Sequence, residues 1–239
     1  MSVSEYKLQP GKPLGSNYTI RGFLGSGWEG EVYKVRENKT GVVRAAKLFY
    51  KRRGSSKLSI MRYARKLHKL KSCNVIIQYH HRGEAPINGD TVEFLVSDYV
   101  DGEMLSSFVN RQRGRRLSSF EALHLFYALV KGVEQIHFRG EYHGDIHSDN
   151  IMVKRKGLEF DVSLVDFYDL GRPTREKIHN DVIDLVNILY EIIGGGKWYR
   201  KCGDDIKQII RGRKHNLILE KFKNAGHLRL ALDNLDWGE

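Results

Sequence analysis

The apolar residues follow a strand-like pattern in the first part of the chain and a helix-like pattern in the rest. Residues 18–50 contain three β-rich runs separated by Gly-rich or Asn-Lys-Thr-Gly turns, which predicts a strand meander. Two further apolar runs follow before residue 97, so we expect an antiparallel sheet of five strands. The expected strands are 18–24, 31–36, 42–50, 75–79 and 92–96.

Beyond residue 97 the apolar residues recur at helical spacing. Ser118 and Glu121 form a capping-box pattern just before a long apolar stripe, and a second stripe covers residues 182–192. One more helix is expected at 55–71. These patterns predict an α+β fold with two lobes: residues 1–97 form a sheet with one helix, and residues 98–239 form a mainly helical lobe.

Composition is that of an ordinary globular protein. The chain has 239 residues, of which 41% are hydrophobic and 29% charged. We expect no membrane span, because no apolar run reaches 18 residues, and no signal peptide, because residues 1–17 are polar. The two cysteines lack metal-like spacing, so a reducing, cytoplasmic (intracellular) location is expected.

Positive charge is concentrated in one part of the sequence. The net charge is +11, and residues 38–83 contain thirteen Lys or Arg and no acidic residue. The basic helix within 51–71 can dock an acidic partner, or it can simply be a solvated helix face. Nucleic-acid binding is not expected, because the stretch lacks interleaved aromatic residues and any nucleic-acid motif.

A glycine-rich motif, G-x-G-x-x-G-x-V, is formed by Gly25, Gly27, Gly30 and Val32. Glycine lets the backbone approach phosphate oxygens and present N–H donors to them. A dinucleotide-binding turn would continue into a helix, whereas here residues 31–36 look like a strand. The motif therefore favours a strand–turn–strand lid over the phosphates of ATP.

Two further segments have the residue types of a nucleotide site. Ala45 and Lys47 share one face of the third expected strand, so a small residue beside adenine and an ammonium group beside the α/β-phosphates lie together. The segment after the last expected strand is a candidate connector, in which the backbone of Asp98 and Val100 hydrogen-bonds adenine.

Three polar residues in the second half have the chemistry of phosphoryl transfer. Asp145 lies five residues before Asn150, and Asp166 follows the next apolar strand, directly before Phe167. Phosphoryl transfer requires one carboxylate to orient and deprotonate the attacking hydroxyl. It also requires a carboxamide and a second carboxylate to hold Mg²⁺ on the phosphates.

Together, in this order and at these separations, the motifs resemble the protein-kinase-like superfamily over residues 17–193. A helical run at 180–191 adds a fifth match, and the resemblance implies that its Asp181 anchors the catalytic-loop backbone. It also implies an ATP- and Mg²⁺-dependent enzyme. The implied roles are phosphate binding by Lys47, orientation of the substrate hydroxyl by Asp145, and Mg²⁺ binding by Asn150 and Asp166.

His147 takes the position at which serine/threonine protein kinases usually carry a catalytic lysine, and it is a candidate catalytic residue. The sequence His-Gly-Asp-x-His is instead similar to aminoglycoside and choline phosphotransferases. His143 and His147, four residues apart, can also suggest a metal pair, whereas the alternative is a structural His143 packed beneath the loop.

The chain also departs from the family pattern at Lys47. The helix that normally supplies a glutamate partner for this lysine has no acid anywhere in residues 51–75, and the aligned place falls near Arg62 or Tyr63. Lys47 is then paired from elsewhere, for example by Asp166, or the nucleotide geometry is unusual.

Three other departures concern regulation. Tyr168 replaces the glycine after Asp-Phe, and Gly144 replaces the arginine before Asp145. Only fourteen residues separate Asp166 from Asp181, so the activation segment is minimal. These features together predict an enzyme that is constitutively assembled and needs no loop phosphorylation.

The sequence therefore favours a compact, atypical protein serine/threonine kinase that acts on a protein substrate. The first alternative is a small-molecule kinase for a sugar, a lipid-linked or an aminoglycoside-like substrate, which the loop containing His147 supports. The second alternative is a pseudokinase that serves as a nucleotide-binding or docking module, which the missing helix glutamate supports.

Overall fold

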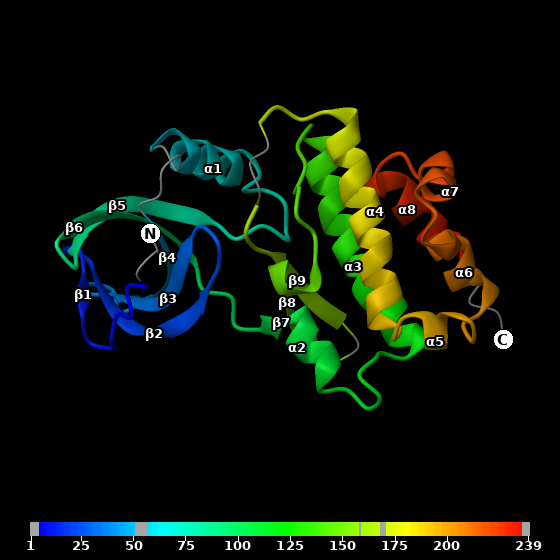
Figure 1. The fold of residues 1–239 in the computed structure, drawn as a ribbon, viewed down its shortest axis with the longest axis horizontal. Helices are drawn as coiled ribbons and strands as arrows, with labels where there is room; N and C mark the ends of the chain where they lie inside the picture. Colours follow the sequence, from blue (N-terminus) through cyan, green and yellow to red (C-terminus); the bar gives the residue numbers. More distant parts are fainter. Residues whose placement is uncertain (1–4, 51–56, 158, 168–170, 236–239) are drawn as a thin grey trace. The chain divides into compact units, whose positions relative to one another are not determined.

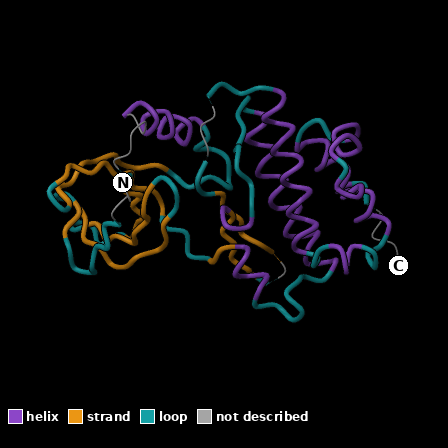
Figure 2. The backbone as a smooth tube through the Cα atoms, viewed as in Figure 1, coloured by secondary structure: helices purple, strands orange, loops and turns teal. Residues whose placement is uncertain are grey.

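The computed structural model describes residues 5–50, 57–157, 159–167 and 171–235. The chain divides into two compact units. The N-terminal unit comprises Met1–Lys71 and Ile77–Val100, and the C-terminal unit comprises Ser72–Ile76 and Asp101–Glu239. Strands predominate in the first unit and helices in the second (Figure 2).

The sheet of the N-terminal unit has six antiparallel strands in the order β1-β2-β3-β4-β6-β5, not the expected five. The additional strand β1 has only two residues, which is too short for an alternating pattern to reveal it. It pairs with the start of β2 at the sheet edge, where a proline is tolerated. The strands are β1 (Pro13–Leu14), β2 (Tyr18–Ser26), β3 (Gly30–Glu37), β4 (Val43–Phe49), β5 (Tyr79–Ile87) and β6 (Asp90–Asp98).

The strand expected at 75–79 is wrong, because β5 begins only at Tyr79. Val75 and Ile76 are instead buried in the C-terminal unit, where Ile76 forms a single bridge to Leu164. Val75 lies so close to Gly132 that a Cβ at that glycine would meet a methyl group of Val75 at 2.0 Å. A short apolar run has the same pattern whether it is buried by strand pairing or by a helix.

The buried side chains of the sheet form the core of the N-terminal unit, and Tyr6 and Leu8 pack against it. Buried Glu31 holds this N-terminal segment in place: it accepts hydrogen bonds from the Tyr6 backbone N–H at 2.7 Å and the Tyr50 hydroxyl at 3.0 Å, and another from the Tyr33 hydroxyl. These three donors satisfy a carboxylate that would otherwise be costly to bury. The helix of this unit is α1 (Lys57–Lys69).

The C-terminal unit is built around two long helices, α3 and α4, which lie side by side (Figure 1). Helix α3 also packs against α8 and β9. Within the described residues, no helix combines the length and apolar character needed to cross a bilayer. The helices are α2 (Leu105–Asn110), α3 (Ser119–Phe138), α4 (Arg175–Ile192), α5 (Gly196–Tyr199), α6 (Asp204–Ile210), α7 (His215–Lys221) and α8 (Ala225–Asp233). A small sheet contains β7 (Glu103–Met104), β8 (Ile151–Lys156) and β9 (Glu159–Leu164).

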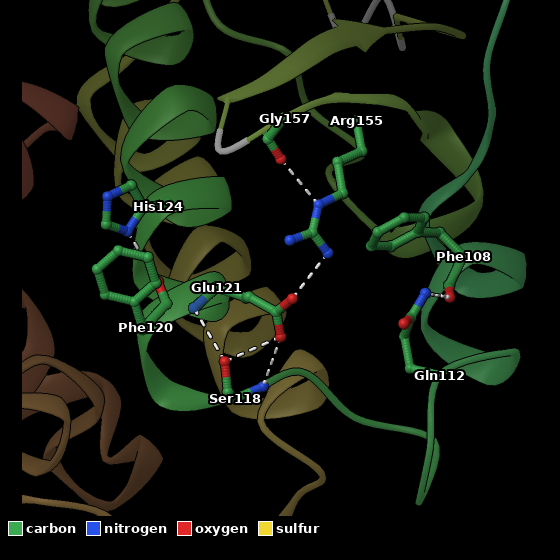
Figure 3. Close-up of polar contacts among 8 residues, drawn as sticks. All are labelled: Phe108, Gln112, Ser118, Phe120, Glu121, His124, Arg155 and Gly157. Carbon is green, nitrogen blue, oxygen red and sulfur yellow. Dashed lines mark hydrogen bonds and ion pairs between the residues drawn. The ribbon is translucent and has the colours of Figure 1, made fainter.

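The capping box expected at the start of α3 is confirmed (Figure 3). The Ser118 hydroxyl accepts the Glu121 backbone N–H at 3.2 Å, and the Glu121 carboxylate accepts the Ser118 N–H at 3.3 Å. The same carboxylate binds Arg155 at 2.7 Å, and Arg155 donates to the carbonyl of Gly157 at 3.0 Å. The start of α3 is therefore fastened to the end of β8.

Candidate active site

The glycine-rich motif forms a turn between β2 and β3, as the sequence predicted. The Gly27 N–H donates to the Gly30 carbonyl at 2.9 Å. Gly30 has no room for a side chain, because a Cβ there would lie 1.9 Å from the Leu48 carbonyl oxygen. Gly25 and Gly27 differ, since their Cβ positions have no atom within 4 Å and neither adopts a left-handed backbone. The fold thus requires glycine at 30 but not at 25 or 27.

We expect alanine substitutions to separate these two kinds of glycine. Gly30→Ala should lower the free energy of unfolding by about 1–3 kcal/mol, because the new methyl group collides with the β4 backbone. Gly25→Ala and Gly27→Ala should leave stability within about 0.5 kcal/mol but weaken ATP binding severalfold. Thermal melts and ATP titrations of the three variants test this; wild-type ATP affinity in Gly27→Ala would remove the phosphate role of the turn.

Strand β4 presents its two faces as the alternation predicted. Ala46 and Leu48 are fully buried in the core, and Ala45 and Lys47 lie on the opposite face. Val32 of β3 pairs directly with Lys47, so it shares that face. Three of the predicted nucleotide contacts of this unit therefore lie on one side of β3 and β4, namely Val32, Ala45 and Lys47.

Lys47 has a partner that the sequence did not reveal. Its Nζ lies 2.8 Å from the Glu29 carboxylate, which belongs to the glycine-rich turn. Tyr63 of α1 lies near the place where the family has its helix glutamate, and its ring centroid is 5.4 Å from the same Nζ. An aromatic face attracts an ammonium group, but it supplies no countercharge. The turn carboxylate supplies that charge, and a pairing of Lys47 with Asp166 stays a prediction.

Asp98, at the start of the connector, is held by several contacts, and its carbonyl accepts the Ser97 hydroxyl at 3.4 Å. The Asp98 N–H already donates to the Gln78 carbonyl at 3.0 Å, and its carboxylate binds Arg44 and His80, each at 2.6 Å. Because a carbonyl oxygen has two lone pairs, the Asp98 carbonyl can accept a second donor, such as the exocyclic amine of adenine. Val100 is the last residue of the N-terminal unit.

In the C-terminal unit, the loop that carries Asp145 is anchored from α4, which confirms the predicted role of Asp181. This fully buried carboxylate accepts the backbone N–H groups of His143 at 2.7 Å and Gly144 at 2.8 Å. Gly144 has φ of +91°, a conformation that glycine adopts without strain. The backbone conformation is thus a physical reason for glycine at the position where the family usually has arginine.

His137 is a second anchor of this loop that the sequence reasoning missed. Its Nε2 lies 3.1 Å from Asp181, and its Nδ1 accepts the Ala225 N–H at 3.1 Å. Because Nδ1 is an acceptor, the proton of the neutral ring is on Nε2 and is donated to Asp181. The only signal in the sequence was that His137 falls at helical spacing from the apolar residues of α3, and this spacing does not indicate Asp181 as its partner.

His143 is a structural residue, as one of the two sequence interpretations held. It is fully buried, its Nδ1 accepts the Asp145 N–H at 3.2 Å, and its Nε2 lies 3.1 Å from the Val165 carbonyl. The ring also packs against Phe167 at 4.2 Å between centroids. Nε2 thus joins the loop to the residue that follows β9, and Nδ1 is used within the loop. Because both ring nitrogens are occupied, a metal pair with His147 is disfavoured.

The loop brings the three predicted phosphoryl-transfer residues into one region of this unit. The Asn150 Nδ2 donates to both the backbone carbonyl and the carboxylate of Asp145, each at 3.0 Å. The backbone carbonyl of Asn150 in turn accepts the N–H of Val165, the residue directly before Asp166, at 3.0 Å. Asp166 has φ of +53°, a strained conformation that is common at functional sites. Tyr168 lies outside the described residues.

His147 also contacts Asp145. Its Nδ1 accepts the Asp149 N–H at 3.3 Å, which places the proton of the neutral ring on Nε2. That Nε2 lies 3.5 Å from the Asp145 carboxylate. Both side chains are about half exposed, at 48% and 50%, so a substrate hydroxyl can reach them.

A further carboxylate, Asp184, belongs to the same region. It lies one helical turn after Asp181 on α4, and burial together with the charges of Asp181 and Asp145 raises its pKa from 3.8 to about 6. Its proximity to the loop carboxylates depends on the tertiary fold, so no sequence pattern indicates it.

This raised pKa predicts how stability depends on pH. Between about pH 4 and pH 6 the folded protein holds a proton on Asp184 that the unfolded chain has lost, so stability should fall as pH rises. Asp184→Asn should therefore raise the melting temperature at pH 7.5 and have no such effect below pH 4. Thermal melts across this range test the assignment; a melting-temperature difference that does not vary with pH would contradict it.

The profile of the protein kinase domain matches residues 18–191. The chain belongs to the protein kinase domain family. The crystal structure of the Mycobacterium tuberculosis PknI kinase domain aligns with a TM-score of 0.68 at 18% identity, covering 95% of this chain and 98% of that one. A mutant of the same domain gives 0.71 at 19% identity with the same coverage. At this identity the likeness shows the kinase fold, which confirms the predicted fold class.

Curated relatives of this kinase-family chain are kinases that are longer than it is. A putative cyclin-dependent kinase F-2 of Oryza sativa subsp. japonica is 31% identical over 193 residues, which cover 78% of this chain and 58% of that protein. A probable serine/threonine-protein kinase of Streptomyces coelicolor is 26% identical over 162 residues, 67% of this chain and 23% of that protein. The chain thus spans little more than half of the rice protein and about a quarter of the bacterial one.

Proposed function

We propose that this chain is the catalytic domain of an ATP- and Mg²⁺-dependent protein serine/threonine kinase. One observation carries the proposal. Buried Asp181 accepts a backbone N–H of the loop that contains Asp145, and within this loop the Asn150 amide donates to the Asp145 carboxylate. Phosphoryl transfer depends mainly on positioning and electrostatic stabilisation, and a loop fastened in this way supplies both.

The proposed nucleotide contacts of the N-terminal unit lie on and beside the β3–β4 face. The turn of Gly25, Gly27 and Gly30 would present backbone N–H groups to phosphate oxygens, and Lys47 would neutralise the α- and β-phosphates. Val32 and Ala45 would contact the adenine ring, and the backbone of Asp98 and Val100 would hydrogen-bond its edge. The open space at Gly25 and Gly27 supports a close approach by a ligand.

The donor atoms of Asn150 and Asp166 fit Mg²⁺, which prefers oxygen ligands. The Asn150 amide nitrogen is used by Asp145, so its Oδ1 is the end left for a cation. Among the described residues, no group of three or more His, Cys, Asp or Glu side chains is arranged to hold a metal, so phosphate oxygens and water would complete the coordination. Bound Mg²⁺ would supply charge stabilisation to the transferring phosphoryl group.

Asp145 is the proposed acceptor of the substrate hydroxyl proton. It is exposed enough to be reached, and the Asn150 amide and the His147 ring hold its carboxylate in one orientation. His147 would take part of the role of the lysine that protein kinases usually carry there. It would act here through its contact with Asp145, whose carboxylate lies 3.5 Å from the His147 Nε2.

Two alternatives have an observation in their favour. His147 and the backbone-driven glycine at 144 support a small-molecule hydroxyl as the acceptor, and the pairing of Lys47 with Glu29 supports a nucleotide-binding module of low turnover. In that module the turn carboxylate would compete with the phosphates for the ammonium group.

Radiolabelled ATP distinguishes these functions. Wild type and Asp145→Ala are incubated with Mg²⁺ and, separately, with casein, with myelin basic protein and with a panel of sugars, choline and aminoglycosides. The proposal expects label on serine or threonine of protein, lost in the variant. Label only on a metabolite would favour the small-molecule kinase, and equal background in both proteins would favour the binding module.

A further inference from the structure

A pocket of about 520 Å³ opens on the C-terminal unit, and none of the proposed catalytic, nucleotide-binding or metal-binding residues lines it. It lies where α3 ends and α4 and α8 begin, and its walls include Phe138 and Arg175 at these helix ends and Lys223 just before α8. The volume is within the range of pockets that bind ligands or anchor side chains. Nothing in the proposed phosphoryl transfer requires this pocket.

The pocket is electropositive. Arg175 and Lys223 are exposed cations, and within the described ranges neither forms an ion pair with a carboxylate. His179 also lines the pocket. Its pKa is lowered by burial and, to a smaller extent, by the charges of Arg175 and Lys223. The acidic wall residue, Glu134, is already paired with Arg229 at 2.6 Å. The two unpaired cations therefore leave an excess of positive charge at the opening.

Two helix starts add to this positive potential. Thr174 caps α4, and its hydroxyl accepts the Lys177 N–H at 3.3 Å. Asn224, itself a wall residue, caps α8 by accepting the His227 N–H at 3.2 Å. The partial positive charges of both helix N-termini thus lie beside the cations.

The pocket wall also contains two apolar side chains, Phe138 and Ile178. Phe138 is 89% exposed, which is unusual for so large an apolar side chain. Exposed aromatic side chains next to arginine are typical of the residues that dominate protein–protein interfaces. A small anion would leave Phe138 uncovered, and nucleic-acid binding would call for a longer basic track than two cations.

We propose that this pocket docks an acidic segment of a partner protein, with carboxylates on Arg175 and Lys223 and an apolar side chain against Phe138. The docked segment would touch His137, which lines the pocket and also donates to Asp181 beneath the catalytic loop. The pocket and the loop anchor therefore share a side chain. The proposal concerns binding alone, so it does not depend on the proposed kinase activity.

Fluorescence anisotropy with a labelled peptide of alternating glutamate and leucine tests the docking. Arg175→Glu with Lys223→Glu should weaken binding at least about tenfold, because attraction becomes repulsion at both contacts. The matched control reverses two exposed cations of α1, Arg62→Glu with Arg65→Glu, which changes net charge equally and should alter affinity less than twofold. Phe138→Ala should also weaken binding, and Arg175→Lys with Lys223→Arg should retain it.

The outcomes separate the alternatives. Loss of peptide binding in the α1 variant but not in the pocket variant would overturn the proposal and favour the basic helix as the acidic docking surface. Equal loss in both would indicate non-specific attraction to a basic protein. Displacement of the peptide by millimolar inorganic phosphate, with no effect of Phe138→Ala, would reduce the pocket to a small-anion site. Thermal melts of each variant check that it is folded.

Discussion

Replacing Asp166 with alanine is expected to remove Mg²⁺-dependent ATP binding, whereas replacing Asp145 is expected to preserve it. Asp166 is a proposed metal ligand, and without its carboxylate the cation that bridges the phosphates loses a charged donor. Asp145 is proposed to act on the substrate hydroxyl, so Asp145→Ala should lower the rate of transfer by about 10²- to 10⁴-fold at nearly unchanged nucleotide affinity.

Calorimetric titration of Mg²⁺–ATP into wild type and both variants, repeated with EDTA, measures this difference. The EDTA series is the internal control, because metal-independent binding should be similar in all three proteins. A normal Mg²⁺ dependence in Asp166→Ala would contradict the metal assignment. A severe loss of Mg²⁺–ATP affinity in Asp145→Ala would mean that Asp145, and not Asp166 alone, holds the metal.

Asp181→Ala is expected to cause the largest loss of stability among single changes at this site. The substitution leaves the N–H groups of His143 and Gly144 and the Nε2 proton of His137 without an acceptor inside the protein. Each buried, unsatisfied donor costs about 1–3 kcal/mol, and the variant should lose about 3–5 kcal/mol in total. Transfer activity should fall as well, because the loop that carries Asp145 is no longer held.

Asp161→Ala is the matched control, since Asp161 is an aspartate of the same unit that pairs with Lys156 on the surface. An exposed pair of this kind contributes about 0–1 kcal/mol. Urea unfolding of both variants gives the comparison. If the urea midpoint of Asp181→Ala equalled that of wild type, the proposed anchoring of the loop by Asp181 would be wrong.

The chemistry of the candidate site could be predicted because it depends on residue types at fixed short spacing. Asp145 and Asn150 belong to one loop, so their separation of five residues already implied that they lie close together. The alternation of β4 similarly predicted that Ala45 and Lys47 share a face, and the capping box at Ser118 required only local hydrogen bonds. Such features depend on neighbours within a few residues.

Predictions failed where apolar pattern alone had to decide how a segment is buried. Residues 75–79 have the apolar character of a strand, but Val75 packs against Gly132 of α3. Strand β1 was missed for the opposite reason, because two residues carry no periodicity. In both cases the deciding contact is with a segment that is distant in the sequence.

Residue types and their order were thus enough to predict the kinase family and the fold class, both of which are confirmed, and to propose the chemistry of the site. Only the tertiary structure decided which partners these residues have: Glu29 for Lys47, His137 for Asp181, and Asp184 beside the loop. It also created the basic pocket, which brings together Arg175 at the start of α4 and Lys223 just before α8. The physical reason is that hydrogen bonds, ion pairs and burial act over a few ångströms in space, whereas sequence patterns report only neighbours along the chain.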